Sequence, residues 1–518
     1  MNTHLSKLNI TQLKPLQEKV IKSLMTNNED VLAILPTGYG KSICYQLPYL
    51  MTNKFIIVVS PLISLMQDQY NKMIKAGIAA NCFFSGSSSK LNWDKLDKKS
   101  ILYFSPENLQ KNREYIDKLF KNDSVGLIAI DECHCITTCD YRPIFQDLGD
   151  LIKHRKCPVL ALTATATNRI INDVKKVLNI PKVTVICGGY GRTNLSITIV
   201  PGDTTLEKNL EKTKTYIKKY IKDGKCIIYA KTKADTDEIA SKLNTLEYPV
   251  RAYHADISTV ERTKIQKEFM ESKTTNIIVA TCAFGMGVDI PNIRLIIHFG
   301  IAKDIENYYQ EIGRAGRDGE NSHCIMFKNN SDYIINKSFI DKMTDELKKK
   351  EQEVRTRKMH QFVETSECRI KYICKYFGDS EQIKCNNCDN CSNNEKTVDL
   401  TTEVNIIIKT VIKLKQCGIN VLSKILTGSK AKDLKDYQKK MDTYGSLSSY
   451  SQDKIKELVN SLINLDYFEQ IKSGDYGNVI LLSTTPYGKS LLNKNHILSS
   501  NLELKEKVVP KYWTKKSH

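Results

Sequence analysis

The chain has 518 residues, of which 77 are lysine or arginine and 58 are aspartate or glutamate, giving a formal net charge of +19. A hydrophobic fraction of 41% with 26% charged residues excludes disorder of the whole chain. The positive surplus favours a polyanionic partner, nucleic acid first and a membrane surface second. The longest apolar runs are strand-length and too short to span a bilayer, so we expect no membrane-spanning segment, and nucleic acid with no membrane is the expected partner.

Sixteen cysteines and a start without a basic region followed by an apolar one predict an intracellular, reducing compartment, with nucleus and cytoplasm undecided. In such a compartment, metal ligands and buried thiols are expected rather than disulfides.

Short apolar runs, each followed by a polar or helical segment, dominate the first half of the chain. They lie at residues 31–35, 55–60, 101–105, 127–131 and 159–163, and the pattern restarts at 225–229, 276–280 and 295–299. Apolar strands separated by helices predict parallel sheets covered on both faces. We therefore expect an α/β protein with two parallel-sheet lobes, at residues 1–192 and 193–342.

The pattern changes after about residue 341. A charge-rich helical stretch at 348–358 precedes a cysteine cluster and a polar linker at 392–396, which delimit a helical metal-binding subdomain at 343–396. Helices and a β-hairpin with its turn at 473–477 follow, within a domain at 397–492. The last residues, 493–518, form a lysine-rich basic tail.

A glycine-rich segment, Thr37-Gly38-Tyr39-Gly40-Lys41-Ser42, follows the first predicted strand and precedes a helix. Glycines let backbone N–H groups wrap a phosphate, and the helix N-terminus adds positive potential. Lys41 would reach the β- and γ-phosphates and Ser42 would hold Mg²⁺. The first glycine of the full phosphate-loop pattern is missing. The segment nonetheless predicts ATP binding.

Two carboxylates, Asp131 and Glu132, end the strand at 127–131. Beside a phosphate loop, one carboxylate can hold Mg²⁺ and a second can activate the attacking water. Asp131 suits the first role and Glu132 the second, and together with Lys41 they predict nucleotide hydrolysis.

Four cysteines, Cys368, Cys385, Cys388 and Cys391, follow the pattern C-x16-C-x2-C-x2-C. Four thiolates suit a tetrahedral Zn²⁺ ion with a structural role. Cys374 is a rival ligand, but its place in a helical stretch suits packing instead.

Several segments resemble the RecQ family of superfamily 2 helicases. They are residues 35–48, 60–69, 131–136, 162–166, 280–289 and 308–319, in family order over both lobes, and the likeness continues through the cysteines to about residue 490. The resemblance implies two RecA-like lobes, then a helical zinc-binding element and a winged-helix domain.

The resemblance also implies roles in hydrolysis. Arg317, with Arg314 beside it, would be the arginine finger, while His134 and Gln310 belong to matched motifs. Gly287 and Asp289 would lie near the nucleotide, and Thr163 and Thr165 would couple nucleotide state to lobe closure. Gln17 would read the adenine edge, but Ile10 and Lys14 stand where the family has an aromatic and an arginine, so looser base selection is expected.

For DNA contacts, the resemblance implies residues on both lobes and in the winged helix. The first-lobe candidates are Ser60, Pro61, Ser64, Gln67, Ser105 and Pro106; the second-lobe candidates are His254 and Thr281; Tyr476 would wedge a duplex at the hairpin tip. The family's aromatic-rich loop is about two residues shorter here and lacks its tryptophan, leaving Tyr141 and Arg142.

These features together predict a zinc-containing, ATP- and Mg²⁺-dependent DNA helicase. The resemblance implies that it moves 3′ to 5′ on DNA and serves recombination, repair or replication. Single-stranded DNA and tailed or forked duplexes are the expected partners, and a monomer is the expected state. The shortened loop motivates an alternative, a DNA-stimulated ATPase or translocase that remodels DNA without efficient unwinding.

Overall fold

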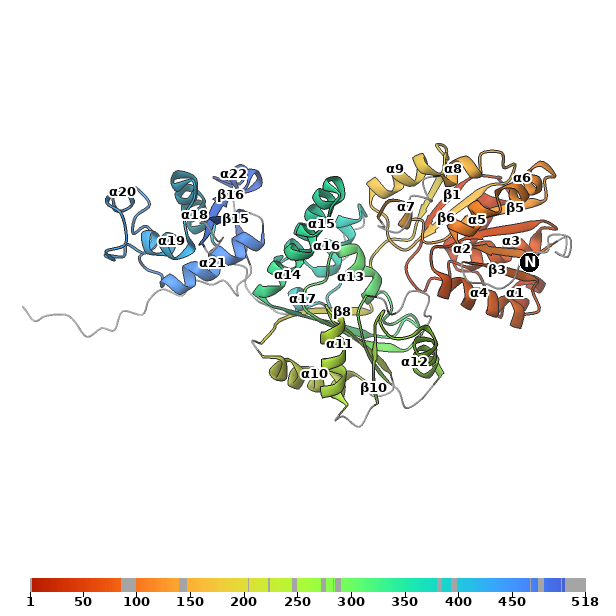
Figure 1. The fold of residues 1–518 in the computed structure, drawn as a ribbon, viewed down its shortest axis with the longest axis horizontal. Helices are drawn as coiled ribbons and strands as arrows, with labels where there is room; N and C mark the ends of the chain where they lie inside the picture. The colour runs from red at the N-terminus through yellow and green to blue at the C-terminus, as the bar shows by residue number, and fades with distance from the viewer. Residues whose placement is uncertain are drawn as a thin grey trace, which may run out of the picture. The chain divides into compact units, whose positions relative to one another are not determined.

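The structure is a computed structural model of the chain (Figure 1). It describes residues 2–84, 99–138, 147–203, 205–221, 224–244, 249–271, 276–282, 284, 290–379, 384–392, 398–465, 467–473, 479–494 and 496–498. The chain divides into two compact units. One comprises Met1–Gly300, Glu306–Phe327 and Ile370–Cys388, and the other comprises Ile301–Ile305, Lys328–Arg369 and Asp389–His518.

The first lobe is built on a seven-stranded sheet in the order β3-β4-β2-β5-β6-β1-β7, in which every pair is parallel. Its strands are β1 (Val31–Ile34), β2 (Phe55–Val59), β3 (Ala80–Phe83), β4 (Ile101–Phe104), β5 (Val125–Ile130), β6 (Val159–Thr163) and β7 (Thr184–Cys187). Its helices are α1 (Asn2–Lys7), α2 (Pro15–Met25), α3 (Ile43–Met51), α4 (Ile63–Lys75), α5 (Pro106–Lys111), α6 (Arg113–Lys121), α7 (Cys135–Thr138), α8 (Leu148–Leu151) and α9 (Asn168–Val177).

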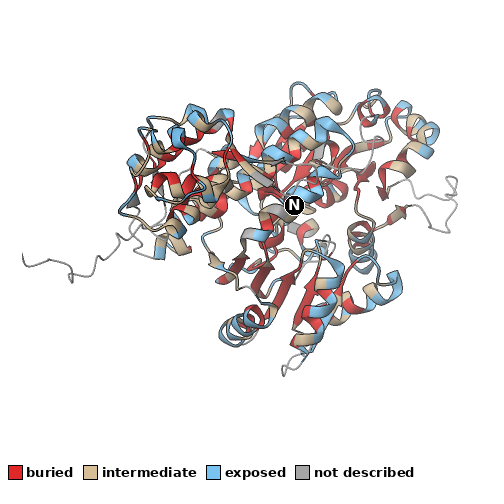
Figure 2. Ribbon diagram, turned by 60° about the vertical axis from the view of Figure 1, so that its left-hand side comes forward, coloured by how far each residue is buried: buried red, intermediate tan, exposed pale blue. Residues whose placement is uncertain are grey.

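Burial explains why the central strands read as continuous apolar runs. Every residue of β1, β2, β4 and β6 is buried, because helices cover both faces of a parallel sheet (Figure 2). Since parallel strands place their carboxyl ends at one edge, the loops after β1, β5 and β6 emerge together. That edge carries the nucleotide-site candidates of this lobe.

The second lobe has a six-stranded sheet in the order β10-β11-β9-β12-β13-β8. Its strands are β8 (Leu195–Pro201), β9 (Lys225–Tyr229), β10 (Val250–Tyr253), β11 (Ile277–Ala280), β12 (Ile293–Phe299) and β13 (Ser322–Lys328). Its helices are α10 (Leu206–Tyr220), α11 (Lys233–Leu243), α12 (Thr259–Glu271) and α13 (Ile305–Ile312). Residues 188–194 connect the last strand of the first sheet to the first strand of the second.

A helical element follows the second lobe and carries the four cysteines. It contains α14 (Asn330–Asp341), α15 (Glu346–Glu364), α16 (Arg369–Tyr376) and α17 (Asp389–Ser392). The longest of these helices, α15, begins where the side chain of Asp345 accepts hydrogen bonds from the N–H groups of Leu347 and Lys348. This cap satisfies two backbone donors that have no partner within the helix.

The C-terminal domain combines helices with a small hairpin. Its elements are β14 (Val398–Asp399), α18 (Thr401–Leu414), α19 (Ile419–Leu426), α20 (Asp436–Lys439), α21 (Gln452–Asn464), β15 (Phe468–Ser473), β16 (Val479–Thr484), α22 (Pro486–Ser490) and β17 (Ile497–Leu498). On α18, Val404, Ile407 and Val411 recur at helical spacing and are fully buried in the domain core.

The structure confirms the predicted α/β class, the two parallel-sheet lobes and the winged-helix arrangement of helices and hairpin. The hairpin pairs β15 with β16, but its predicted turn and Tyr476 lie outside the described residues. Among the described residues, no helix is both long enough and apolar enough to cross a membrane.

Candidate active site and metal centre

The phosphate loop joins β1 to α3 and turns on two glycines. Gly38 and Gly40 adopt φ values of +79° and +87°, a left-handed conformation that glycine reaches without strain. Thr37 lies at the start of this turn, and Ser42 stands directly before α3, where the helix N-terminus faces the loop. The loop therefore has the form of a cradle for a phosphate group.

The two predicted carboxylates lie beside this loop at the end of β5. The ammonium of Lys41 is 3.4 Å from Glu132 Oε1, and the Glu132 N–H donates to Asp131 Oδ1 at 3.0 Å. Glu132 adopts φ +48°, which is uncommon for a residue with a side chain. The structure thus brings Lys41, Asp131 and Glu132 together, as an Mg²⁺–nucleotide site requires.

Burial and neighbouring charges shift the pKa values of the two carboxylates in opposite directions. Burial and the nearby negative charge of Glu132 raise the pKa of Asp131 to about 6. Burial also opposes ionisation of Glu132, but Lys41 and His134 outweigh it and hold the pKa of Glu132 below its usual range. Of the two carboxylates, Glu132 is therefore the one that keeps its charge to lower pH.

A chain of hydrogen bonds runs from the acidic motif to α13 of the second lobe. His134 Nδ1 is 2.9 Å from Thr163 Oγ1, and His134 Nε2 is 3.0 Å from Gln310 Nε2. Gln310 Nε2 also donates to Thr165 Oγ1 at 3.2 Å. These four predicted residues therefore form one polar network at the sheet edge.

The two candidate arginines take different positions. A Cβ atom added to Gly38 would lie 2.9 Å from Cγ of Arg317, so the Arg317 side chain packs directly on the phosphate loop. Arg314 is buried beside Tyr229. Burial raises the pKa of Tyr229 to about 12, and the charge of Arg314 partly opposes this rise. The geometry favours Arg317 over Arg314 as the residue that faces a bound phosphate.

The side chain of Gln17 is used within the protein. Its amide nitrogen donates to the carbonyl oxygens of Tyr39 and Gly40 at 2.8 and 3.1 Å, and its Oε1 accepts from the Lys14 N–H at 2.9 Å. The Lys14 ammonium lies over the Tyr39 ring, 4.9 Å from its centroid. Gln17 thus supports the phosphate loop instead of presenting a free amide edge to a base.

Four residues named from the sequence lie outside the described residues, in addition to Tyr476. They are Tyr141, Arg142, Gly287 and Asp289. The structure therefore assigns no position to the shortened loop at 139–146.

The DNA-contact candidates of the two lobes include both exposed and buried side chains. Ser64 and Gln67 are exposed on α4, and Thr281 is half-buried after β11. The side chains of Ser60, Pro61, Ser105, Pro106 and His254 are buried. Ser105 accepts a hydrogen bond from the Asn108 N–H and so caps α5, and His254 Nε2 lies 3.0 Å from Asp237 Oδ1. Local structural roles account for these two side chains.

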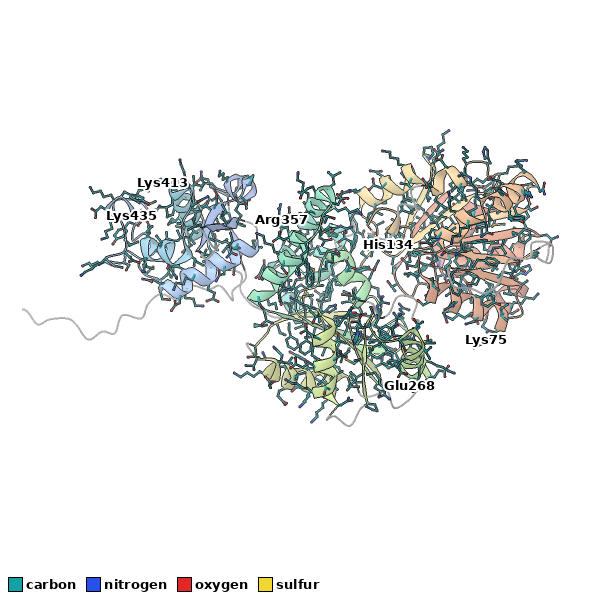
Figure 3. All side chains as sticks on the ribbon, viewed as in Figure 1. Lys75, His134, Glu268, Arg357, Lys413 and Lys435 are labelled. Atoms are coloured by element: carbon teal, nitrogen blue, oxygen red, sulfur yellow. The ribbon has the colours of Figure 1, made fainter. Side chains whose placement is uncertain are left out.

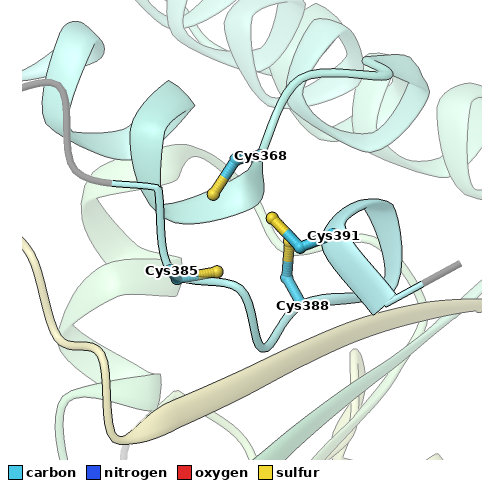
Figure 4. A group of neighbouring side chains, drawn as sticks. All are labelled: Cys368, Cys385, Cys388 and Cys391. Atoms are coloured by element: carbon cyan, nitrogen blue, oxygen red, sulfur yellow. The ribbon is translucent and has the colours of Figure 1, made fainter. Parts of the chain in front are cut away.

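The four predicted cysteines converge on one point (Figure 4). The sulfur atoms of Cys368, Cys385, Cys388 and Cys391 all lie within 4.8 Å of one another. Zn–S bonds of about 2.3 Å in a tetrahedron separate the sulfurs by just under 4 Å, so the cluster fits one Zn²⁺ ion. Cys374 is buried on α16 and is not part of the cluster.

Polar contacts around the cysteines hold their segments in place. The Arg369 guanidinium binds both carboxylate oxygens of Asp389, at 2.9 and 3.1 Å. The Asn390 amide donates to the carbonyl oxygens of Thr365 and Glu367, each at 2.7 Å. These bonds link the residues next to Cys368 with the residues between Cys388 and Cys391, as expected of a structural metal site with no open position.

Sequence reasoning missed three residues in the connection between the lobes. Tyr190 contacts the segment after β6, Arg192 contacts the phosphate loop, and Asn194 contacts the loop after α13. All three side chains donate to backbone carbonyl oxygens that are distant in the sequence, and such acceptors carry no sequence signal.

The structure and four family models agree on the class of protein. The models described as DEAD/DEAH box helicase and helicase conserved C-terminal domain match residues 14–174 and 208–319. RecQ zinc-binding matches residues 330–392, and the RQC domain matches residues 394–509. Two parallel-sheet lobes with a phosphate loop and these motifs define a superfamily 2 helicase.

Curated relatives narrow this class to one family. The chain is 34% identical over 481 residues to the ATP-dependent DNA helicase RecQ of Bacillus subtilis, covering 90% of this chain and 79% of the relative. The chain belongs to the RecQ family. RecQ of Haemophilus influenzae is 32% identical and covers 88% of this chain and 74% of its own length. A protein of Acanthamoeba polyphaga mimivirus, provisionally named as an ATP-dependent RNA helicase, is 35% identical, with coverages of 89% and 87%.

Solved structures support the fold. The DEAD-box helicase Mss116 bound to single-stranded RNA aligns with a TM-score of 0.53 and 20% identity, over 69% of this chain and 81% of its own. The helicase Lhr of Mycobacterium smegmatis, bound to single-stranded DNA, aligns with a TM-score of 0.51 and 17% identity, over 93% of this chain and 60% of its own.

Proposed function

We propose that this RecQ-family protein is an ATP-dependent helicase that unwinds duplex DNA by moving 3′ to 5′ on single-stranded DNA. The observation that carries the proposal is the packing of the Arg317 side chain on Gly38, which brings a second-lobe arginine onto a first-lobe phosphate cradle. Arginine fingers of this kind raise hydrolysis rates by roughly 10³ to 10⁵. Hydrolysis would then depend on closure of the two lobes.

Each candidate has a proposed role in hydrolysis. Lys41 and the loop at 37–42 would hold the phosphates, and Ser42 and Asp131 would hold Mg²⁺, which supplies charge neutralisation at the γ-phosphate when bound. Glu132 would accept the proton of the attacking water. His134 and Gln310 would link this centre to the second lobe, and Arg317 would face the charge that develops on the phosphate.

DNA is proposed as the substrate on the strength of the accessory elements. The RecQ relatives are named as DNA helicases, and the chain retains both the zinc element and the RQC domain. Lysines lie on the winged-helix domain, among them Lys435 (Figure 3). Such cations suit phosphate contacts with a duplex. The name of the mimivirus relative makes RNA the rival substrate.

Recombination, repair or replication is the proposed setting, and a monomer is the proposed state. The proposed domain limits are 1–192 and 193–342 for the lobes, 343–396 for the zinc element and 397–492 for the winged helix.

An ATPase that remodels DNA without unwinding it is not favoured, because the matched relatives are named as helicases and Lys41, Asp131, Glu132 and Arg317 are all present.

The test measures ATP hydrolysis and strand separation together on a duplex with a 3′ single-stranded tail. Matched 5′-tailed and RNA duplexes test polarity and substrate, and Lys41→Ala is the blank. Unwinding of the 3′-tailed DNA that disappears in the variant supports the proposal. Hydrolysis without separation would replace it with the remodelling ATPase, and unwinding of RNA alone would replace it with an RNA helicase.

A further inference from the structure

The connection between the two lobes carries an arginine whose bonds reach both halves of the ATP site. Arg192 is half-buried and lies between β7 and β8. Its Nη2 donates to the carbonyl oxygens of Ala315 and Gly316, at 3.0 and 2.8 Å. Its Nη1 donates to the carbonyl oxygen of Thr37, at 3.4 Å. One guanidinium therefore joins the phosphate loop to the loop that ends in Arg317.

The contacts of Arg192 depend on the shape of its side chain. Three backbone carbonyls and the Asn194 side-chain oxygen, 3.2 Å from Nε, surround one planar group. A guanidinium offers five N–H donors in a fixed fork, whereas a lysine ammonium is a compact point charge with three donors. Lysine could supply the charge at this place but could not reproduce the set of bonds.

Two further side chains hold the same loop from other directions. The Asn194 amide donates to the carbonyl oxygens of Gly316 and Glu320, each at 3.0 Å. The Arg294 guanidinium pairs with both oxygens of Asp318, with Nη1 3.1 Å from Oδ1. The residues on each side of Arg317 are thus fixed through backbone or carboxylate oxygens.

The approach of the loops leaves little freedom between them. A Cβ atom added to Gly313 would lie 2.8 Å from Thr37 Oγ1, and one added to Gly38 would meet the Arg317 side chain. Small displacements of the loop at 313–319 would therefore move Arg317 off the phosphate cradle. Misplacement of a catalytic group by about 1 Å can lower a rate by about 100-fold.

We propose that Arg192 is a positioning residue that holds the loop at 313–319 against the phosphate loop, so that Arg317 is correctly placed to contact the γ-phosphate. Arg192 acts through backbone carbonyls and does not itself contact nucleotide. The inference rests on the proposed function of Arg317 as the arginine finger. Its effect belongs to the chemical step, so it appears in kcat rather than in the KM for ATP.

The experiment compares Arg192→Lys, Arg317→Ala and the double variant in steady-state ATP hydrolysis with saturating single-stranded DNA. We expect Arg192→Lys to lower kcat by about 10- to 100-fold with less than a threefold change in KM. We expect the double variant to be no slower than Arg317→Ala, because both changes remove the same contact. Arg113→Lys, at an exposed i,i+4 ion pair on α6, is the matched control.

Other outcomes separate the two proposals. If Arg317→Ala lowers kcat but Arg192→Lys retains the full rate, charge alone suffices and the inference about Arg192 is overturned. A raised KM with unchanged kcat would make Arg192 a direct nucleotide contact and would also overturn it. If Arg317→Ala retains the full rate, the finger assignment fails and the inference fails with it.

A second variant keeps the test decisive if Arg192→Lys does not fold. Asn194→Ala removes the bonds to Gly316 and Glu320 and the acceptor of Arg192 Nε, but it leaves the three bonds from Arg192 to backbone carbonyls in place. It should lower kcat in the same direction by a smaller factor, with unchanged KM. A wild-type kcat in a folded Asn194→Ala protein, judged by zinc content and thermal unfolding, would count against positioning of the loop.

Discussion

Nε2 of His134 lies 3.0 Å from the amide nitrogen of Gln310, although 176 positions separate the two residues in the chain. Because the Gln310 amide nitrogen is a donor, His134 Nε2 must accept, and its proton then sits on Nδ1 and faces Thr163. The Thr163 hydroxyl in turn donates to the Thr165 carbonyl oxygen at 3.0 Å. The same Nδ1 also lies 3.3 Å from Glu132 Oε2, so the network links Gln310 to the acidic motif through one histidine ring.

The network predicts that Gln310→Ala uncouples the lobes without weakening nucleotide binding. Two hydrogen bonds, each worth about 0.5–1.5 kcal/mol net, are lost, so kcat should fall about tenfold while the KM for ATP changes little. Steady-state ATPase assays with and without single-stranded DNA give both values. Gln361→Ala, on α15 and outside this hydrogen-bond network, is the control. A raised KM with an intact kcat would contradict the coupling role.

Gly38→Ala tests the close approach of Arg317 to the phosphate loop. In Gly38→Ala the new residue must adopt a positive φ, and its Cβ would lie 2.9 Å from the Arg317 side chain. In Gly77→Ala the new residue must also adopt a positive φ, of +68°, but its Cβ has open space around it. Both should lose about 1–2 kcal/mol of stability from the strained backbone, a fall of a few degrees in Tm. Only Gly38→Ala should also lose kcat, by about 100-fold. Equal kcat losses in the two variants would refute a specific contact with Arg317.

Gln17→Ala should weaken ATP and GTP alike. The Gln17 side chain supports the carbonyl oxygens of Tyr39 and Gly40, so its loss disturbs the phosphate cradle, which every nucleotide shares. We expect the Kd of fluorescent ATP and GTP analogues to rise by about tenfold each, from the loss of about 1.4 kcal/mol of hydrogen bonding. Weaker binding of ATP only would show that Gln17 turns to read adenine when the nucleotide binds.

Cys388→Ser should release the metal and unfold the helical element. Cys388 is fully buried in the four-thiol cluster, and zinc binding supplies folding free energy to sites of this kind. Zinc content, measured with a chromogenic chelator, should fall from one ion per chain to near zero, and Tm should drop. Cys187→Ser, at an exposed thiol on β7, should leave both values unchanged. One retained zinc in Cys388→Ser would point to a different ligand set.

The sequence predicted the strands whose residues are all buried, such as β1 and β6, because continuous apolar runs mark them. It missed β7 and β10, at the sheet edges, where only part of each strand is buried. Motif spacing located Lys41 and the zinc cysteines. Arg192 was not predicted, because its acceptors are carbonyl oxygens more than 120 positions away and backbone carbonyls carry no sequence signal.

The left-handed backbone of Glu132, at φ +48°, has a consequence for the evolution of this chain. A residue with a side chain in this conformation costs about 1–2 kcal/mol, whereas glycine adopts it freely and asparagine more readily than most. A library selected for heat resistance alone should therefore drift toward glycine or asparagine at position 132 and lose ATP hydrolysis as it does so. Selection for turnover keeps the chain below the thermal stability that its own fold permits.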